Sequence, residues 1–135
     1  MQGNRPELLD DGYESGGWML KLTALSADEP QRIVRFLTGV LLACGGWILT
    51  RSTYGSELAE LDFEFARAGS MEIYAALVAS GIELTSDSHR QMAQFCHCTQ
   101  ILLRSRAFEI ARVTMVIYSD KTLVPREREE LLRVG

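Results

Sequence analysis

The chain has 135 residues, of which 47% are hydrophobic and 24% are charged, and its formal net charge at pH 7 is −4. A chain of this size and composition can fold as one domain without disulfides or a structural metal. Its basic residues alternate with acids, as in residues 126–129, and this pattern disfavours nucleic acid, whose phosphates require a basic patch.

The start of the chain is polar and acidic, and it has neither the basic start nor the apolar centre of a signal peptide. We expect residues 1–17 to form a flexible N-terminal arm. The most apolar stretch, residues 40–49, is too short to span a bilayer and is interrupted by Gly45 and Gly46. The sequence therefore predicts a cytoplasmic protein without a membrane partner.

The first half of the chain predicts a strand, a helix and a hairpin. Residues 18–26 alternate between apolar and polar, as in a half-buried strand. Ser26 and Glu29 fit a capping box that would open a helix, which Gly45 and Gly46 would end. Strands are predicted at residues 47–53 and 57–66, joined by a tight turn at residues 54–56. The pattern leaves open which face of the first of these strands meets the core.

The second half predicts two helices, a strand and a final short helix. Residues 70–80 form the first of these helices, Gly81 ends it, and residues 82–84 are a connector. Ser88 and Gln91 fit a second capping box, which would open the next helix. A strand is predicted at residues 108–119, and Pro125 opens a short charged helix.

The order of these elements is β-α-β-β-α-(α)-β, which matches the split βαβ pattern of ferredoxin-like folds. The prediction is an α+β fold with a four-stranded antiparallel sheet, helices on one face, and the first strand between the third and the last. The domain organisation would be the N-terminal arm at 1–17, a single α+β domain at 18–120, and a short C-terminal helix at 121–135.

This sheet would carry charged side chains on its outer face. Lys21 and Arg112 would share that face with Glu60, Asp62 and Glu64. Two interpretations remain open: a solvated face, or a surface that pairs with another subunit or covers a ligand.

The cysteines and histidines do not have the spacing of a disulfide framework, a metal site or a catalytic thiol–imidazole pair. Cys44, Cys96 and Cys98 are odd in number and two are one residue apart, so they are not a disulfide framework. On a helix, Cys96 and Cys98 would point about 200° apart and could not chelate one metal with His97. Cys98 and His89 are candidates for thiol chemistry, but helix geometry separates them. Known nucleotide and hydrolase motifs are also absent. We predict no catalytic residue, no metal and no cofactor.

One segment resembles a known family. Residues 22–34, LTALSADEPQRIV, resemble the strand, Asp-x-Pro-Gly loop and helix of ACT domains, which are small βαββαβ regulatory modules. Residues 43–48, ACGGWI, resemble the family's glycine-containing entry into the second strand. The likeness covers about residues 18–84. It implies a dimer or higher oligomer that senses a small molecule, often an amino acid, at a subunit interface.

The resemblance implies a ligand site at the loop, flanked by Asp28, Glu29 and Gln31. Backbone N–H groups at the helix N-terminus would suit a carboxylate, and the two acids would suit an amino group. The alternative is that these residues only cap the helix. Gln31 departs from the family pattern, which usually has Gly there, and its side chain would block the site or alter its specificity.

Three functional hypotheses follow. The first is a regulatory or sensing domain that binds a small molecule, such as an amino acid, and forms a homo-oligomer. The second is a protein–protein interaction module that docks a partner through the arm and the C-terminal helix, with Leu131, Leu132 and Val134 as contacts. The third and least favoured is a small ferredoxin-like enzyme with a pocket between sheet and helices.

Overall fold

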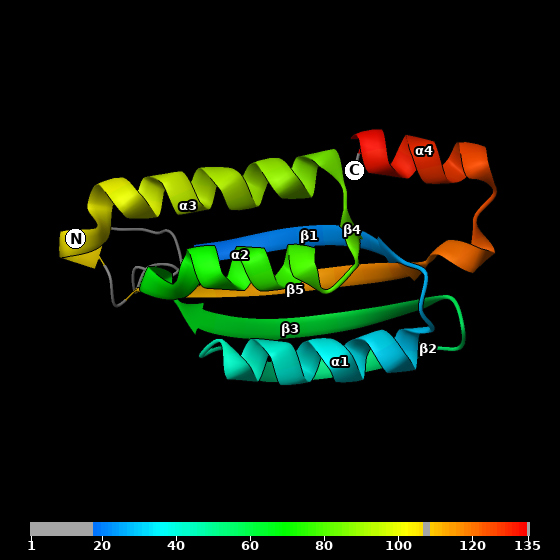
Figure 1. Cartoon of the computed structure of the whole chain (residues 1–135), viewed down its shortest axis with the longest axis horizontal. Coiled ribbons are helices and arrows are strands. Elements are labelled where there is room, and N and C mark those ends of the chain that lie inside the picture. The colour runs from blue at the N-terminus through cyan, green and yellow to red at the C-terminus, as the bar shows by residue number, and fades with distance from the viewer. Residues whose placement is uncertain (1–17, 107–108, 135) are drawn as a thin grey trace, which may run out of the picture.

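The structure is a computed structural model that describes residues 18–106 and 109–134, and for residues 102–106 it describes the backbone alone. The N-terminal arm predicted for residues 1–17 lies outside the described residues. Figure 1 shows the arrangement of the helices and strands. In chain order they are β1 (Trp18–Ser26), α1 (Pro30–Ala43), β2 (Trp47–Tyr54), β3 (Leu58–Ala66), η2 (Arg67–Gly69), α2 (Ser70–Ala79), β4 (Glu83–Leu84), α3 (Ser86–Arg106), β5 (Ile110–Ser119), η3 (Asp120–Thr122) and α4 (Pro125–Val134).

The five strands form one mixed sheet in the order β2-β3-β5-β1-β4. β5 runs parallel to β1 and antiparallel to β3, and the outer pairs β2–β3 and β1–β4 are antiparallel. The α+β class is confirmed, but the four-stranded antiparallel sheet is wrong. The last strand does neighbour the first, as expected. However, β5 lies between β1 and β3, so β1 does not pair with β3.

One face of the sheet forms the core. Side chains that alternate along β1, β3 and β5 are buried together with the apolar stripes of α1, α2 and α3, so these helices pack on the same face (Figure 1). The most deeply buried members, at 0–1% exposure, include Leu22, Ala24, Leu37, Leu61, Phe63, Phe65, Leu77, Val113 and Met115.

α1 begins later than the capping box predicts. Ser26 is the last residue of β1, and its hydroxyl accepts a hydrogen bond from the Asp28 backbone N–H at 3.0 Å. Glu29 occupies the N-cap position without a side-chain hydrogen bond, and Pro30 is the first helical residue. The predicted capping box is therefore wrong, because the fixed φ of Pro30 suits the first helical position. The predicted helix end is confirmed, since Gly45 has a φ of +90°.

The β2–β3 hairpin is confirmed, and its register decides which side chains face inward. Ile48 pairs with Phe63 on the core side, and the register shifts between Ile48 and Thr50. After this shift Arg51 and Thr53 align with the inward positions of β3, and they therefore lie on the helix-covered side of the sheet.

The connector predicted at residues 82–84 contains the short strand β4, whose two residues pair with Ala24 and Leu25 of β1. Beyond β4, side chains of α3 take over the edge of β1. The Lys21 N–H donates to Gln91 Oε1 at 3.3 Å, and Gln91 Nε2 donates to the Lys21 carbonyl at 2.8 Å. The side-chain amide of Gln91 therefore acts as the peptide group of a missing neighbouring strand.

The second predicted capping box is also wrong, because the side chains of Ser88 and Gln91 bind the backbone of β1. α3 begins at Ser86, and Thr85 caps it, because the Ser88 N–H donates to Thr85 Oγ1 at 3.2 Å. Ser88 Oγ accepts a hydrogen bond from the Thr23 N–H at 2.7 Å. Ser88 and Gln91, which the sequence predicts to form a capping box, therefore bind β1 instead.

Candidate functional site

Two adjoining clefts lie at the N-terminal end of α1. The loop cleft has a volume of about 450 Å³ and is lined by Ala27, Asp28, Glu29, Gln31, Arg32, Arg35 and Lys121. The strand cleft, of about 320 Å³, lies between α1 and β2 and is lined by Gln31, Val34, Arg35, Arg51, Ser52 and Thr53. Gln31 and Arg35 line both clefts, so the two hollows adjoin along one side of α1.

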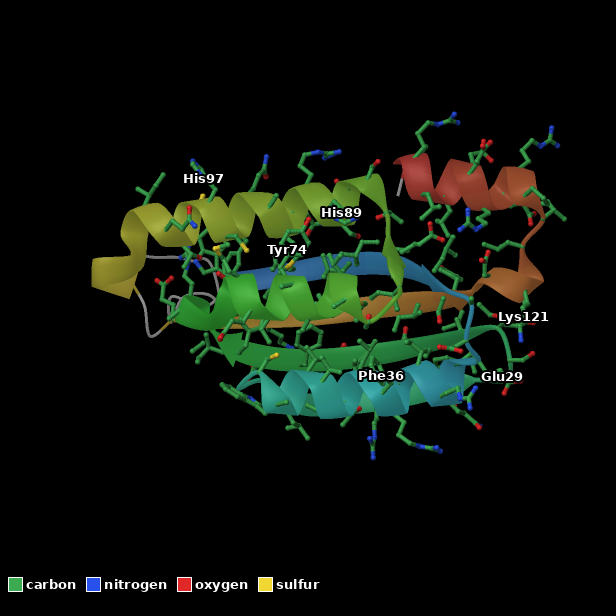
Figure 2. All side chains as sticks on the ribbon, viewed as in Figure 1. Glu29, Phe36, Tyr74, His89, His97 and Lys121 are labelled. Carbon is green, nitrogen blue, oxygen red and sulfur yellow. The ribbon has the colours of Figure 1, made fainter. Side chains whose placement is uncertain are left out.

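The topology of the sheet assembles the loop cleft. β1 and β5 are parallel neighbours, and their last residues, Ser26 and Ser119, are aligned. Parallel strands end at the same edge of a sheet, so the loop before α1 and the 3-10 turn η3 emerge side by side. Figure 2 shows the result, with Glu29 and Lys121 at the same end of the molecule.

The loop cleft carries charges of both signs. Asp28 and Glu29 are exposed acids of the loop, and Arg32, Arg35 and Lys121 are exposed cations. Within the part of the chain that the structure describes, none of the three cations forms an ion pair. A cleft with free cations beside carboxylates can hold a molecule that carries both an anionic and a cationic group.

The backbone at the start of α1 contributes less than expected. Pro30 has no N–H, and the N–H groups of Arg32 and Ile33 both donate to the Glu29 carbonyl at 3.0 Å. The predicted capture of a carboxylate by free helix N–H groups therefore finds few donors. The side chains of Arg32, Arg35 and Lys121 supply that capacity instead.

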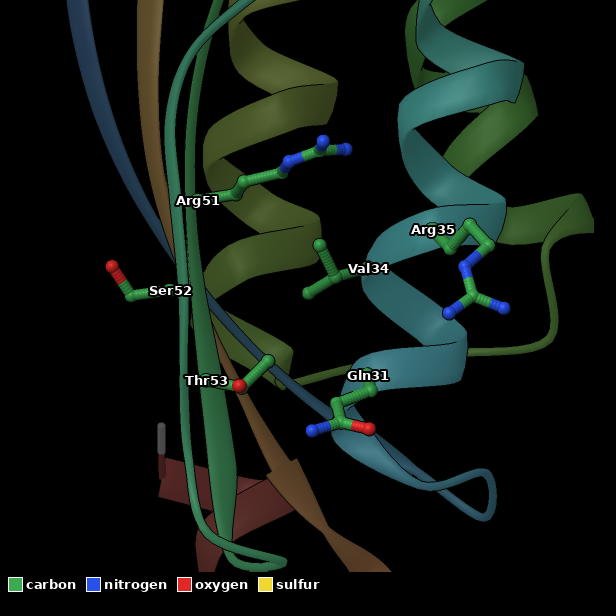
Figure 3. A pocket seen from close by; sticks show the side chains of 6 residues that line it. All are labelled: Gln31, Val34, Arg35, Arg51, Ser52 and Thr53. Atoms are coloured by element: carbon green, nitrogen blue, oxygen red, sulfur yellow. The ribbon is translucent and has the colours of Figure 1, made fainter.

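The strand cleft presents a second set of polar groups. Figure 3 shows Arg51 pointing from β2 toward α1, with Val34 on the facing side of the helix. The Arg51 guanidinium donates to Thr38 Oγ1 at 3.4 Å, and no carboxylate pairs with it among the described residues. The strand cleft is therefore cationic.

The structure brings together all three residues predicted for the ligand site. Asp28, Glu29 and Gln31 line the loop cleft. Sequence reasoning missed Lys121 because it assigned an antiparallel sheet, in which the ends of β1 and β5 would lie apart. It missed Arg51 because the direction of that side chain depends on the register shift in β2.

The three residues 96–98 do not form a site. Cys96 is buried at 7% exposure, whereas His97 and Cys98 are exposed. Burial raises the pKa of the Cys96 thiol, and the nearby Ser70 hydroxyl opposes part of that rise. Such a thiol is a core residue rather than a nucleophile.

The remaining histidine, His89, and the possible metal ligands were the other candidates for a chemical site. His89 of α3 is exposed, and its Nδ1 lies 2.8 Å from the hydroxyl of Tyr74, which is on α2 (Figure 2). Across residues 18–106 and 109–134, no group of three or more His, Cys, Asp or Glu side chains could hold a metal ion.

The outer face of the sheet carries the charged set that the sequence predicts. The register aligns Lys21 and Asp62 with Thr114, and Glu64 with Arg112. Each acid of β3 has a partner on a neighbouring strand, which favours a solvated face. These contacts are the Arg112–Asp62 ion pair at 3.8 Å and the hydrogen bonds from Trp47 to Glu64 at 2.9 Å and from Tyr54 to Glu60 at 3.1 Å.

A further hollow lies beside α4. It has a volume of about 570 Å³, and its lining includes Leu123, Leu131 and Val134 together with Tyr118. The interaction hypothesis names Leu131, Leu132 and Val134 as contacts, and of these Leu131 and Val134 line the hollow whereas Leu132 does not.

Among the described helices, none is both long and apolar enough to cross a membrane. No family model, curated protein or solved structure matches this chain. The likeness to ACT domains therefore stays a prediction from the sequence.

Proposed function

We propose that this protein is a sensing domain that binds a small zwitterionic metabolite, such as an amino acid, in the loop cleft. The carboxylate of the ligand lies against Arg32, Arg35 and Lys121, and its ammonium group lies against Asp28 and Glu29. Charge-assisted hydrogen bonds of this kind are stronger than neutral ones, and an arginine can hold a carboxylate through two of them.

One observation carries the proposal: three cations that form no ion pair among the described residues line the same hollow of about 450 Å³ as two exposed carboxylates. The lining of this hollow contains no histidine, cysteine or hydroxyl side chain. It therefore offers charged groups for recognition without a thiol, hydroxyl or imidazole group, which favours binding over catalysis by those groups. The position of the cleft also coincides with the loop that resembles ACT domains.

Thermal shift and calorimetry of the full chain test this proposal. The screen uses the amino acids, each beside the matched carboxylic acid that lacks the amino group and the matched amine that lacks the carboxylate. Binding at a hundredfold excess over Kd stabilises the native state by about 2.7 kcal/mol, which raises Tm by several degrees. We expect one amino acid, or a small group of them, to stabilise the chain more than either matched compound does.

Variants connect the ligand to the cleft. Lys121→Gln and Arg35→Gln should each weaken binding by about tenfold, since each removes a charged hydrogen-bond donor. Arg133→Gln changes an exposed cation of α4 that lies outside both clefts, and it should bind as the unchanged chain does. A ligand whose affinity is the same in all three variants would remove the loop cleft from consideration, and a screen in which no compound binds would count against sensing.

A second candidate function, a protein–protein interaction module, is favoured by the apolar hollow beside α4. Its lining leucines and Val134 are the kind of residues that a partner buries. Leu131→Asp should abolish partner capture without changing ligand binding at the loop cleft. Sedimentation of the same variant also tests whether this surface supports the homo-oligomer that the sequence predicts.

A further inference from the structure

The two edges of the sheet are finished in different ways. At one edge, β4 is two residues long, and α3 satisfies the backbone of β1 beyond it through Ser88 and Gln91. At the other edge, β2 spans Trp47–Tyr54, and every residue of it except Ile48 is exposed. Within the described residues β2 pairs with β3 alone. Its outer row of backbone N–H and C=O groups is therefore open.

β2 has few of the features that protect an edge strand. It contains no Lys and no Pro, and its single charged residue is Arg51. The register shift between Ile48 and Thr50 disturbs only its beginning. From Thr50 to Tyr54 the pairing with β3 is regular, so this stretch presents a continuous edge to which another strand can add.

We propose that the edge of β2 binds an extended, acidic segment of a partner protein by strand addition. The backbone of the segment pairs with Thr50–Tyr54. Its side chains alternate between the two sides of the sheet, so every second one lies on the helix side, beside the strand cleft. There Arg51 and Arg35 are cations without a carboxylate partner among the described residues.

The charges also define the pattern of the segment. Acids at alternate positions meet Arg51 and Arg35, whereas the residues between them face the outer side of the sheet. On that side β3, which lies beyond β2, carries Glu60, Asp62 and Glu64. The intervening residues of the segment are therefore not acidic. The preferred segment therefore alternates an acid with a neutral β-forming residue.

A second copy of the chain fits this edge less well. A copy paired through its own β2, with both helix layers on the same side of the joined sheet, adds a second Arg51 to the cationic face. The repulsion of like charges disfavours that pairing. The proposal uses the strand cleft and the edge of β2. Its test rests on Arg51, which lines the strand cleft and not the loop cleft, because Arg35 lines both.

Fluorescence anisotropy with the full chain tests the proposal. The probe is a short labelled peptide with blocked ends, in which Glu alternates with Thr or Val. The comparison peptide has the same composition, with its Glu residues grouped together. We expect the alternating peptide to bind at least about tenfold more tightly, and to slow amide hydrogen exchange within residues 50–54.

Charge reversal makes the test specific. Arg51→Glu changes an exposed side chain, so the fold should remain, as circular dichroism can verify. This variant should lose about tenfold in affinity for the Glu peptide and regain binding to the matching Lys peptide. Arg133→Glu, on α4, is the control and should bind the Glu peptide normally.

Three results would overturn the proposal. The first is equal binding of the alternating and grouped peptides. The second is affinity for the Glu peptide that survives Arg51→Glu. The third is a free chain that sediments as a dimer with the amides of residues 50–54 already protected, because the edge would then belong to a second copy.

Discussion

At the scale of single residues, Arg67 is the most constrained charge in the described chain. Its side chain is 1% exposed, and its Nη1 lies 2.7 Å from Glu109 Oε1. Its Nε donates to Thr99 Oγ1 at 2.8 Å, and the guanidinium lies 4.6 Å from the Trp18 ring centroid and 4.8 Å from that of Phe95. A buried guanidinium with a carboxylate, a hydroxyl and two ring faces is held by contacts that no other residue type can make together.

Arg67→Met should therefore be strongly destabilising. Methionine keeps an unbranched apolar stem, but removing one partner of a buried ion pair costs about 3–5 kcal/mol, because the remaining charge stays desolvated. Urea denaturation measures the loss. Arg112→Met is the matched control, since its ion pair with Asp62 is on the exposed outer face and should contribute less than about 1 kcal/mol. Combining Arg67→Met with Glu109→Gln should restore part of the stability. If Arg67→Met alone is as stable as the unchanged chain, the ion pair is dispensable.

The sequence offers no sign of this cluster. Alternation correctly places Phe63 and Phe65 on the core side of β3, because periodicity records which face a side chain takes. Arg67 follows that strand and looks like a loop residue. Its burial depends on Glu109, which is 42 positions away in the chain. Only the folded arrangement brings the two charges together.

At the scale of elements, the closed edge of β1 gives a direct test of side-chain mimicry. Gln91→Ala removes two hydrogen bonds to the Lys21 backbone and leaves that part of the edge to water. The expected cost is about 1–2 kcal/mol in urea denaturation, with faster amide exchange at Lys21. Gln94→Ala, an exposed position of the same helix, should have little effect. Equal stabilities of the two variants would mean that water replaces the Gln91 amide without loss.

The sequence predicts the ends of the helices better than their starts. Helix ends at Gly45 and Gly81 are correct, because both residues have a positive φ that other residue types avoid. Helix starts are wrong where a polar pair has two possible uses. Ser88 and Gln91 have the spacing of a capping box, but their side chains bind another element. Local spacing does not distinguish these uses.

At the scale of the whole molecule, strand pairing decides the composition of the candidate site. The loop residues Asp28, Glu29 and Gln31 are adjacent in sequence, so a local motif is enough to predict them. Lys121 joins them only because β5 is parallel to β1. Apolar alternation shows that a strand has a buried face, but it does not show which neighbour that strand selects.

The central position of β5 makes a final prediction about folding. β5 is the last strand in the chain, yet it separates β1 from β3, and its inward residues Val113, Met115 and Ile117 are at most 1% exposed. Burying three such side chains contributes about 5–9 kcal/mol, which is comparable to the whole stability of a domain, about 5–15 kcal/mol. A chain that ends at residue 106 should therefore lose cooperative thermal unfolding.

Removal of α4 provides the matched comparison. α4 has no buried residue and is held by ion pairs from Arg128 to Glu83 and Asp120. A chain that ends at residue 124 should keep a cooperative transition at a lower Tm, measured by circular dichroism. If the chain that ends at residue 106 also unfolds cooperatively, then β1 and β3 must be able to pair directly. That result would show that the direct pairing of β1 with β3 expected from the sequence is accessible to this chain, and that β5 adds to a sheet that can form without it.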